Sequence, residues 1–275
     1  MIDPTTPPTG SHLWGNLVQG LLALLLVVAV IVVALVVVTH RDLPPKHVAE
    51  SSSPTPQNMA SGGVLLTGKD HQISALMTPA VAIGSAIPTD TSAHSDTVNI
   101  VEYIDFQCPY CLQFEQTNLS RTAQLVADGK ATLEIHPIAI LDRSSQGTRY
   151  SSRAENAAAC VANFVPDAFL NLTSALFQYQ PEEGSSGLTN AELITVLGKA
   201  GVSGTALTRC VTNETLRDWV TATTKAATDG SFEHVAATPT QFQGTPTVFV
   251  NGAEYSGSLT NATEFEDFVA ARAAG

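Results

Sequence analysis

The sequence predicts an α/β fold in which a block of helices interrupts a sheet, and three observations support this prediction. A strand, a helix and a second strand follow one another between residues 98 and 140, an order typical of a parallel β-α-β unit. Between residues 148 and 232 the apolar residues recur only at helical spacing. Finally, Asn251-Gly252 separates two apolar runs, which is the strongest short-range signal of a β-hairpin.

Length and charge narrow the function classes. The chain has 275 residues, enough for one large domain or two modest ones, and a formal net charge of −12. We find no basic cluster, so nucleic acid is not expected as a partner. We interpret the acidity as a solubility feature rather than as a binding signal.

An apolar segment near the N-terminus predicts a membrane anchor. Residues 20–38 form an unbroken apolar run, and a helix of this length spans roughly 30 Å, the hydrocarbon thickness of a bilayer. We predict a disordered lead at 1–16, a transmembrane anchor at 17–39 and a flexible Pro- and Ser-rich linker at 40–63. A cleaved signal peptide is the alternative, but the basic n-region and the A-x-A site are missing.

The charges that flank this segment conflict with the chemistry described below. Arg41 and Lys46 follow the span and no Lys or Arg precedes it. The positive-inside tendency alone would therefore place the rest of the chain in the cytoplasm. The cysteines, discussed below, favour a location outside the cytoplasm, and we base the predicted orientation on them.

The next segment, residues 64–147, is expected to hold the first half of the sheet. Residues 64–66 and 81–83 are candidates for edge strands, and residues 98–104 and 132–136 are predicted strands. A helix is predicted after Cys108, ending near Ala127. Residues 148–235 are predicted to form an inserted helical domain, with helices at 150–164, 166–178, 189–199, 205–212 and 214–229.

The last segment, residues 236–275, is expected to complete the sheet. Residues 247–250 and 253–256 flank Asn251-Gly252 and are predicted to form the hairpin. Residues 263–274 are predicted to form a final helix, with Phe265, Phe268 and Val269 on one face.

The residues with the clearest chemistry are Cys108-Pro109-Tyr110-Cys111, directly after the apolar run at 98–106. Pro109 suits a first helical turn, where its missing N–H would have no partner. Cys108 is then expected near the N-cap, at the positive end of the helix dipole. That position lowers a thiol pKa, and a thiolate is the species that attacks disulfides. The motif therefore predicts a redox-active pair.

Two motifs carry a resemblance to a known family: EYIDFQCPYC at 102–111 and GTPTVFVNG at 244–252. In this order and at this separation, they resemble the thioredoxin fold with a helical insertion. Within that superfamily they resemble the DsbA-like disulfide oxidoreductases, in particular the membrane-anchored bacterial type. The resemblance covers about residues 96–274. It implies that Cys108 is the exposed nucleophile and Cys111 the buried resolving thiol, with Pro109 and Tyr110 tuning the redox potential.

The resemblance also implies roles for an acid and a proline. Glu102 lies within an apolar run, where burial would raise the pKa of its carboxyl, and it is expected to pass protons to and from Cys111. The alternative is that Glu102 faces solvent. Pro246 is expected to follow a cis bond and to lie beside Cys108, which leaves the backbone of Thr245 free to pair with an incoming peptide.

Cys160 and Cys210 both fall in the helical segment. We predict a structural disulfide between two helices, which would stabilise the fold by roughly 4 kcal/mol in the chain-entropy model. A second redox pair, a metal site and two free thiols are the alternatives. A stable disulfide implies an oxidising compartment, and this argument outweighs Arg41 and Lys46.

The sequence gives little support for metal or nucleotide chemistry. Histidines are scattered, and no HxxxH, second CxxC or Gly-rich phosphate loop occurs. We therefore expect no metal and no cofactor.

These observations predict an extracytoplasmic thiol–disulfide oxidoreductase that introduces disulfides into exported proteins through Cys108 and Cys111. The expected location is the cell membrane, with one span and the catalytic domain outside. Reduced exported proteins are the expected substrates, and the resemblance implies a membrane quinone-linked partner that reoxidises the enzyme. A disulfide isomerase or reductase of the same fold remains an alternative, because the family that the chain resembles has His at the position of Tyr110 in its strongly oxidising members. A tethered metal chaperone that uses Cys108 and Cys111 as ligands and an inactive binding module are further alternatives.

Overall fold

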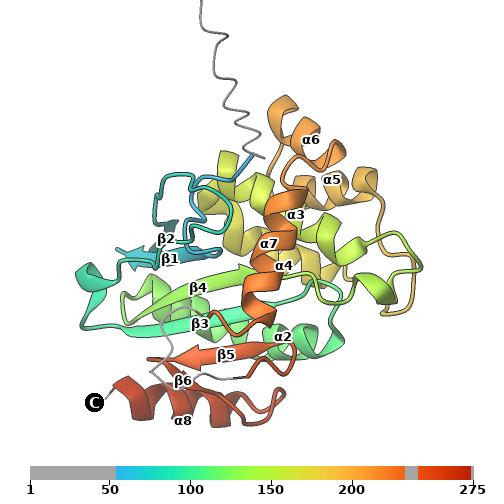
Figure 1. The fold of residues 1–275 in the computed structure, drawn as a ribbon. Coiled ribbons are helices and arrows are strands. Elements are labelled where there is room, and N and C mark those ends of the chain that lie inside the picture. The colour runs from blue at the N-terminus through green and yellow to red at the C-terminus, as the bar shows by residue number, and fades with distance from the viewer. Residues whose placement is uncertain (1–53, 233–240, 274–275) are drawn as a thin grey trace, which may run out of the picture. The chain divides into compact units, whose positions relative to one another are not determined.

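A mixed six-stranded sheet organises the part of the chain that the computed structural model describes, residues 54–232 and 241–273. The strand order is β2-β1-β4-β3-β5-β6 (Figure 1). The strands are β1 (Val64–Lys69), β2 (Gln72–Ala75), β3 (Val98–Ile104), β4 (Ala131–Pro137), β5 (Thr247–Val250) and β6 (Ala253–Glu254).

The predicted β-α-β unit is confirmed. Strands β3 and β4 are parallel, with Glu102 opposite Ile135, and helix α2 (Pro109–Ala127) connects them. Strand β5 runs antiparallel on the other side of β3, and the predicted hairpin links it to β6. At its turn, Asn251 and Gly252 both have positive φ, the conformation that an Asn-Gly turn provides at little cost.

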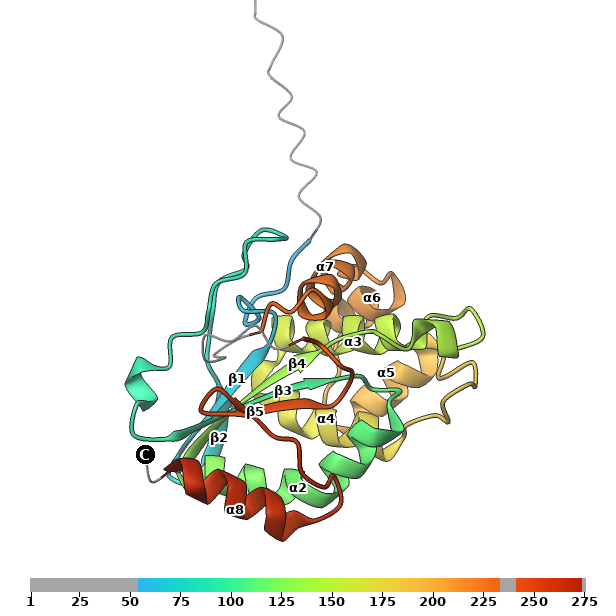
Figure 2. The ribbon, with the colours of Figure 1, turned by 60° about the horizontal axis from the view of Figure 1, so that its bottom comes forward.

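Helices cover both faces of the sheet. On one face α2 lies beside α8 (Ala262–Ala273), with the ring centroids of Phe114 and Phe265 5.1 Å apart (Figure 2). Helix α7 (Arg217–Thr228) crosses the other face, where Ala227 packs with Tyr103 and Phe249. Because both faces are covered, β3 and β4 are buried along almost their whole length.

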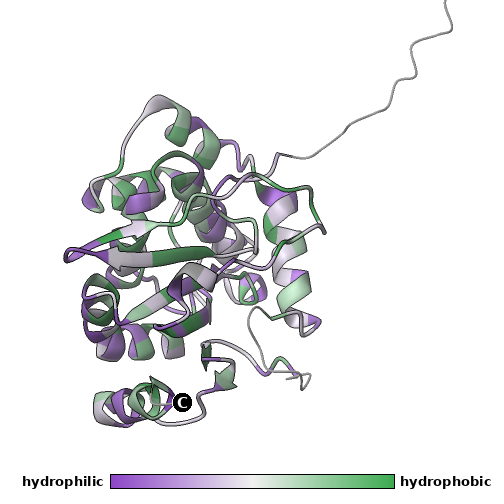
Figure 3. Cartoon of the chain, turned by 90° about the vertical axis from the view of Figure 1, so that its left-hand side faces the viewer, coloured by the Kyte–Doolittle hydropathy of each residue, from purple (hydrophilic) through white to green (hydrophobic). Residues whose placement is uncertain are grey.

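The helical block lies within the predicted 148–235 segment. Its helices are α3 (Tyr150–Phe164), α4 (Phe169–Gln178), α5 (Asn190–Lys199), α6 (Thr205–Thr212) and α7. Helices α4, α5, α6 and α7 each have a buried and an exposed side, and the helical ribbons in Figure 3 carry both hydrophobic and hydrophilic residues. Helix α3 differs, because it is buried over nearly all of its length. The described residues belong to one compact unit, so the block is part of the same body as the sheet.

Several helix boundaries differ from the prediction, and three of the differences have a local reason. Pro166–Ala168 forms a 3-10 turn before α4 instead of its first turn. Thr189 is the N-cap of α5 in a capping box with Glu192, so it precedes the helix. Helix α7 starts at Arg217 instead of 214, because Glu214 has φ 47°, outside the helical region.

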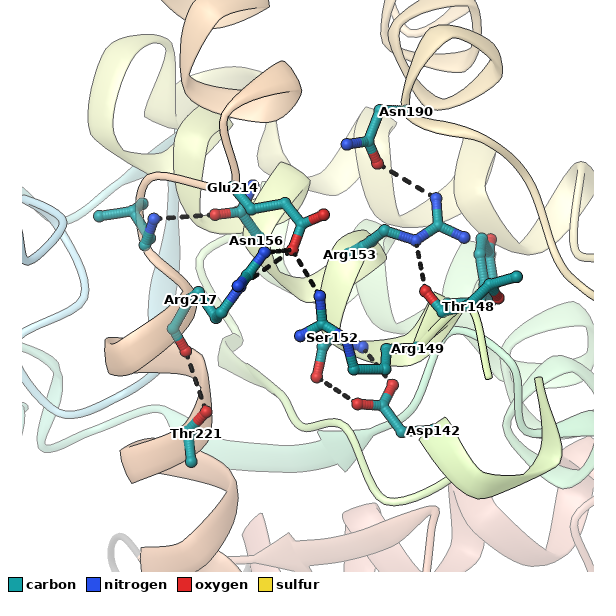
Figure 4. Close-up of polar contacts among 12 residues, drawn as sticks. Asp142, Thr148, Arg149, Ser152, Arg153, Asn156, Asn190, Glu214, Arg217 and Thr221 are labelled. Atoms are coloured by element: carbon teal, nitrogen blue, oxygen red, sulfur yellow. Dashed lines mark hydrogen bonds and ion pairs between the residues drawn. The ribbon is translucent and has the colours of Figure 1, made fainter. Parts of the chain in front are cut away.

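A polar cluster at the start of α3 connects the helical block to the end of β4 (Figure 4). Asp142, in the turn after β4, accepts hydrogen bonds from the backbone and hydroxyl of Ser152 at 2.9 and 2.6 Å. Glu214 accepts from both Arg149 and Arg217, at 3.0 and 2.6 Å. These contacts fix α3 and the start of α7 relative to the sheet.

Two predictions for the N-terminal part of the described fold are wrong. The linker predicted at 40–63 ends earlier, because residues 58–63 are buried, and Asn58 donates a hydrogen bond to the carbonyl oxygen of Ala162. The candidate strand at 81–83 is not a strand; β1 pairs instead with β2, whose polar sequence QISA gave no signal.

The predicted lead and anchor, residues 1–39, lie outside the described residues. Among the helices of residues 54–232 and 241–273, none combines the length and the apolarity that crossing a bilayer requires.

Cys160 on α3 and Cys210 on α6 form a disulfide, with their Cα atoms 6.0 Å apart. Asn156, one turn before Cys160, accepts a hydrogen bond from the N–H of Leu216 and donates to the carbonyl oxygen of Cys210. The bridge therefore holds the α6–α7 segment against the buried helix α3.

We predict that replacing both bridging cysteines, Cys160→Ala with Cys210→Ala, lowers the free energy of unfolding by about 2–4 kcal/mol, because the unfolded chain loses a cross-link over 50 residues. Urea denaturation with both redox cysteines reduced measures this change. The matched control, Cys108→Ala with Cys111→Ala, removes two thiols without opening a cross-link, and an equal loss in the control would contradict the prediction.

Candidate active site

Cys108 and Cys111 are free thiols at the start of α2. Cys108 is the N-cap in extended conformation and Pro109 occupies the first turn. The expectation of an exposed nucleophile is wrong for this structure: Cys108 retains 4% of its accessible surface, Cys111 none, whereas Tyr110 between them retains 59%. Tyr110 is therefore the most exposed residue of the motif.

The two thiols have opposite pKa shifts. The pKa of Cys108 is lowered from 9.0 to about 6, chiefly because the Cys111 thiol donates to its thiolate. Burial opposes this effect, while the Thr245 side chain and the backbone N–H groups of Cys111 and Tyr110 support it. The pKa of Cys111 is raised well above 9.0, first by burial and then by the adjacent sulfur of Cys108. The pair therefore ionises at Cys108.

Thr245 contacts the nucleophile through its carbonyl oxygen, and the Thr245–Pro246 bond is cis, as expected. The Cys108 thiol donates to the carbonyl oxygen of Thr245 at 3.2 Å, a contact that favours the protonated form. The Thr245 hydroxyl oxygen is buried and has no partner among the described residues. Of the two Thr245 groups, the hydroxyl is the one that can stabilise the thiolate, since a hydroxyl can donate a hydrogen bond and a carbonyl cannot.

Asp105, which sequence reasoning did not select, organises the loop before Cys108. It is fully buried, and its carboxylate accepts four hydrogen bonds from the surrounding loops and α3. The donors are the N–H groups of Gln107, Ile140 and Leu141 and the hydroxyl of Ser151. Burial raises the pKa of Asp105 to about 7 against these donors. The carbonyl oxygen of Asp105 in turn accepts from the N–H of Cys108 at 2.9 Å.

Gln180 connects the helical block to the same loop. Its side-chain amide donates to the carbonyl oxygens of Phe106 and Cys108, at 3.1 and 2.9 Å. Gln180 lies just after α4, about 70 residues from the motif, so no local pattern in the sequence could have identified it.

Glu102 is buried, with 1% of its surface exposed, so the alternative that it faces solvent is wrong. Burial raises the pKa of Glu102 to about 7, and a hydrogen bond from Glu115 partly offsets this rise. Glu115 was missed, although its spacing was informative. It lies four residues after Cys111 on α2, and such residues share one face of a helix.

Within residues 54–232 and 241–273, the structure brings no three His, Cys, Asp or Glu side chains together in a group that could hold a metal ion.

We predict that alkylation of the reduced protein by iodoacetamide has its midpoint near pH 6, because Cys108 reacts as the thiolate. The variant Cys111→Ala removes the main donor to that thiolate, so its midpoint should rise by at least one pH unit. Mass spectrometry after timed labelling gives both profiles. A midpoint above pH 8 in the unsubstituted protein would contradict this description of the site.

The comparisons with known proteins agree with this geometry. The family model described as Thioredoxin matches residues 93–270. No curated relative matches the sequence.

Several solved structures are similar to this chain. Reduced disulfide bond oxidoreductase (DsbG) from Mycobacterium tuberculosis is 31% identical, with a TM-score of 0.53 over 65% of this chain and 79% of that one. Oxidised DsbA from the same organism is 26% identical, with a TM-score of 0.57 over 78% and 93%. BdbD from Bacillus subtilis, at 17% identity and a TM-score of 0.55, covers 81% and 98% and shares the fold. The chain belongs to the thioredoxin family and, within it, to the DsbA-like thiol–disulfide oxidoreductases.

Proposed function

We propose that this oxidoreductase works in the oxidising direction and introduces disulfides into exported proteins through Cys108 and Cys111. The observation that carries the proposal is the opposite shift of the two thiols, with the pKa of Cys108 lowered to about 6 and that of Cys111 raised. A thiolate that the protein stabilises favours the reduced enzyme, and an enzyme that favours its reduced form is an oxidant.

The size of this effect follows from the shift. At pH 7 a thiol with a pKa of about 6 is mostly ionised, whereas one at 9.0 is almost entirely protonated. The reduced pair is therefore favoured about tenfold, which corresponds to about 30 mV for a two-electron couple. This is a fraction of the roughly 150 mV that separates thioredoxin from DsbA, so the remainder depends on Tyr110 and the other surroundings of the disulfide.

The reaction begins with the Cys108–Cys111 disulfide. A substrate thiolate attacks the sulfur of Cys108, a mixed disulfide forms there, and Cys111 leaves as a thiolate. Attack at Cys111 is disfavoured because that residue has no accessible surface. Glu102, with its pKa near 7, supplies the proton that Cys111 takes up.

The second step releases the product. A second thiolate of the substrate attacks the substrate sulfur of the mixed disulfide, and Cys108 leaves. Its low pKa makes it a good leaving group. Two substrate thiols are then oxidised and the two enzyme cysteines are reduced.

Tyr110 and the backbone of Thr245 are the groups we propose for contact with the substrate. Tyr110 is the exposed member of the motif. The carbonyl oxygen of Thr245 binds the Cys108 thiol in the reduced protein. A substrate in the mixed disulfide would displace that contact and free the carbonyl for a peptide N–H.

We further propose that the domain acts outside the cytoplasmic membrane, held by one span at 17–39 and reoxidised by a quinone-linked membrane partner. The apolar run at 20–38 supports the span. The Cys160–Cys210 disulfide supports an oxidising compartment.

We predict that the oxidised protein, at stoichiometric amounts, converts a reduced two-cysteine peptide to its disulfide and that Cys108→Ser abolishes this conversion. Mass spectrometry of the peptide measures it. The control Cys160→Ala with Cys210→Ala, assayed at a temperature where it is folded, should keep most of the activity. An unsubstituted protein that leaves the peptide reduced but reduces insulin disulfides would contradict the oxidising direction.

A further inference from the structure

Glu115 is a buried acid that the reaction above leaves without a role. It lies on α2 with 4% of its surface exposed. Its position four residues after Cys111 places both side chains on the same helix face. Across from it, Glu102 projects from β3 on the side of the sheet that α2 covers, since its neighbours Ile100 and Ile104 belong to the core on that side.

The two acids are within hydrogen-bonding reach of each other, and they have few other partners. Oε2 of Glu102 and both carboxyl oxygens of Glu115 are buried and accept no hydrogen bond from any described residue. Two ionised carboxylates would be acceptors only. A hydrogen bond between them therefore requires a proton on one of the two.

No cation among the described residues compensates the pair. Glu134 and His136 lie on the opposite face of β4, where His136 stacks on Tyr103. The remaining ionisable side chains of the elements packed on α2 and β3 are engaged elsewhere or exposed. They are Asp105 with its four donors, Arg121 paired with Glu266, Arg272 over Phe268, Tyr255 bonded to Ser258, and the exposed Lys69, Tyr110, Glu254, Glu264 and Asp267.

We propose that Glu115 remains protonated and donates its hydrogen bond to Glu102, so that Glu102 alone exchanges the proton with Cys111. This inference rests on the proposed function and assigns Glu115 as a positioning residue for the proton donor. The pKa shifts agree: burial and the negative charge of Glu102 raise the pKa of Glu115 well above 4.5, whereas the bond from Glu115 lowers that of Glu102.

The hydrogen bond from Glu115 brings the pKa of Glu102 close to neutral pH. Burial alone would hold the Glu102 proton too tightly for it to leave readily at pH 7. When the Cys108–Cys111 disulfide opens, the proton moves from Glu102 to the Cys111 thiolate, and the hydrogen bond from Glu115 stabilises the carboxylate that is left. On reoxidation Cys111 returns the proton to Glu102, so Glu115 keeps its own proton throughout.

The test is a pH titration of the reduced protein carrying ¹³C-labelled glutamate side chains, followed by NMR. We expect the Glu102 carboxyl to titrate near pH 7 and the Glu115 carboxyl to stay protonated through pH 8, with each signal assigned by its loss in the variant of that residue. In Glu115→Leu the donor is lost and the midpoint near pH 7 should rise by at least one unit. In Glu115→Gln the side-chain amide still donates, so the midpoint should stay within about half a unit.

Two outcomes would overturn the proposal. If Glu115 were ionised at neutral pH, both Glu115 variants would remove a charge and lower the midpoint together. A second variant covers the case in which Glu115→Leu does not fold. In Glu102→Gln the titration near pH 7 should vanish, and its persistence would show that Glu102 is not the group that titrates there. The titration needs no substrate, so its result is independent of whether the enzyme oxidises exported proteins.

Discussion

The structure depends on burying a dithiol and two acids where α2 covers the sheet, away from water. Burial penalises every charge there, so each group ionises only where specific donors support it. Cys108 has the Cys111 thiol, two backbone N–H groups and the Thr245 side chain, and it ionises easily. Cys111 lies deeper and holds its proton. The difference between two chemically identical side chains is thus a consequence of their surroundings.

Contacts from the remainder of the fold fix the loop that carries Cys108. Asp105 joins the loop before Cys108 to α3 and to the chain after β4 through four hydrogen bonds. Gln180 reaches the same loop from the helical block. The Cys160–Cys210 disulfide then fixes α6 against α3. The helical insertion therefore fixes the loop that carries Cys108. Within the motif Tyr110 is exposed, Pro109 is half-buried and both cysteines are buried.

Much of this could be predicted because it is encoded locally. The β-α-β unit, the Asn251-Gly252 hairpin and the position of Cys108 at a helix start each follow from a few adjacent residues. The remainder depends on long-range contacts. Ile140 donates to Asp105 and Gln180 donates to Phe106, and both contacts join segments that are tens of residues apart in the sequence. The burial of Cys108 likewise depends on the folded chain around it. Glu115 could be predicted only in part. Its spacing from Cys111 is visible in the sequence, but its interaction with Glu102 on β3 is not.

The most direct measurement of the central claim is the equilibrium redox potential of the Cys108–Cys111 pair at pH 7, obtained in glutathione buffers with alkylation and mass spectrometry at each ratio. A stabilised Cys108 thiolate predicts a potential clearly above the value of about −270 mV typical of thioredoxin. A potential at or below that value would mean that the protein favours its disulfide, and it would contradict the proposal that this enzyme is an oxidant.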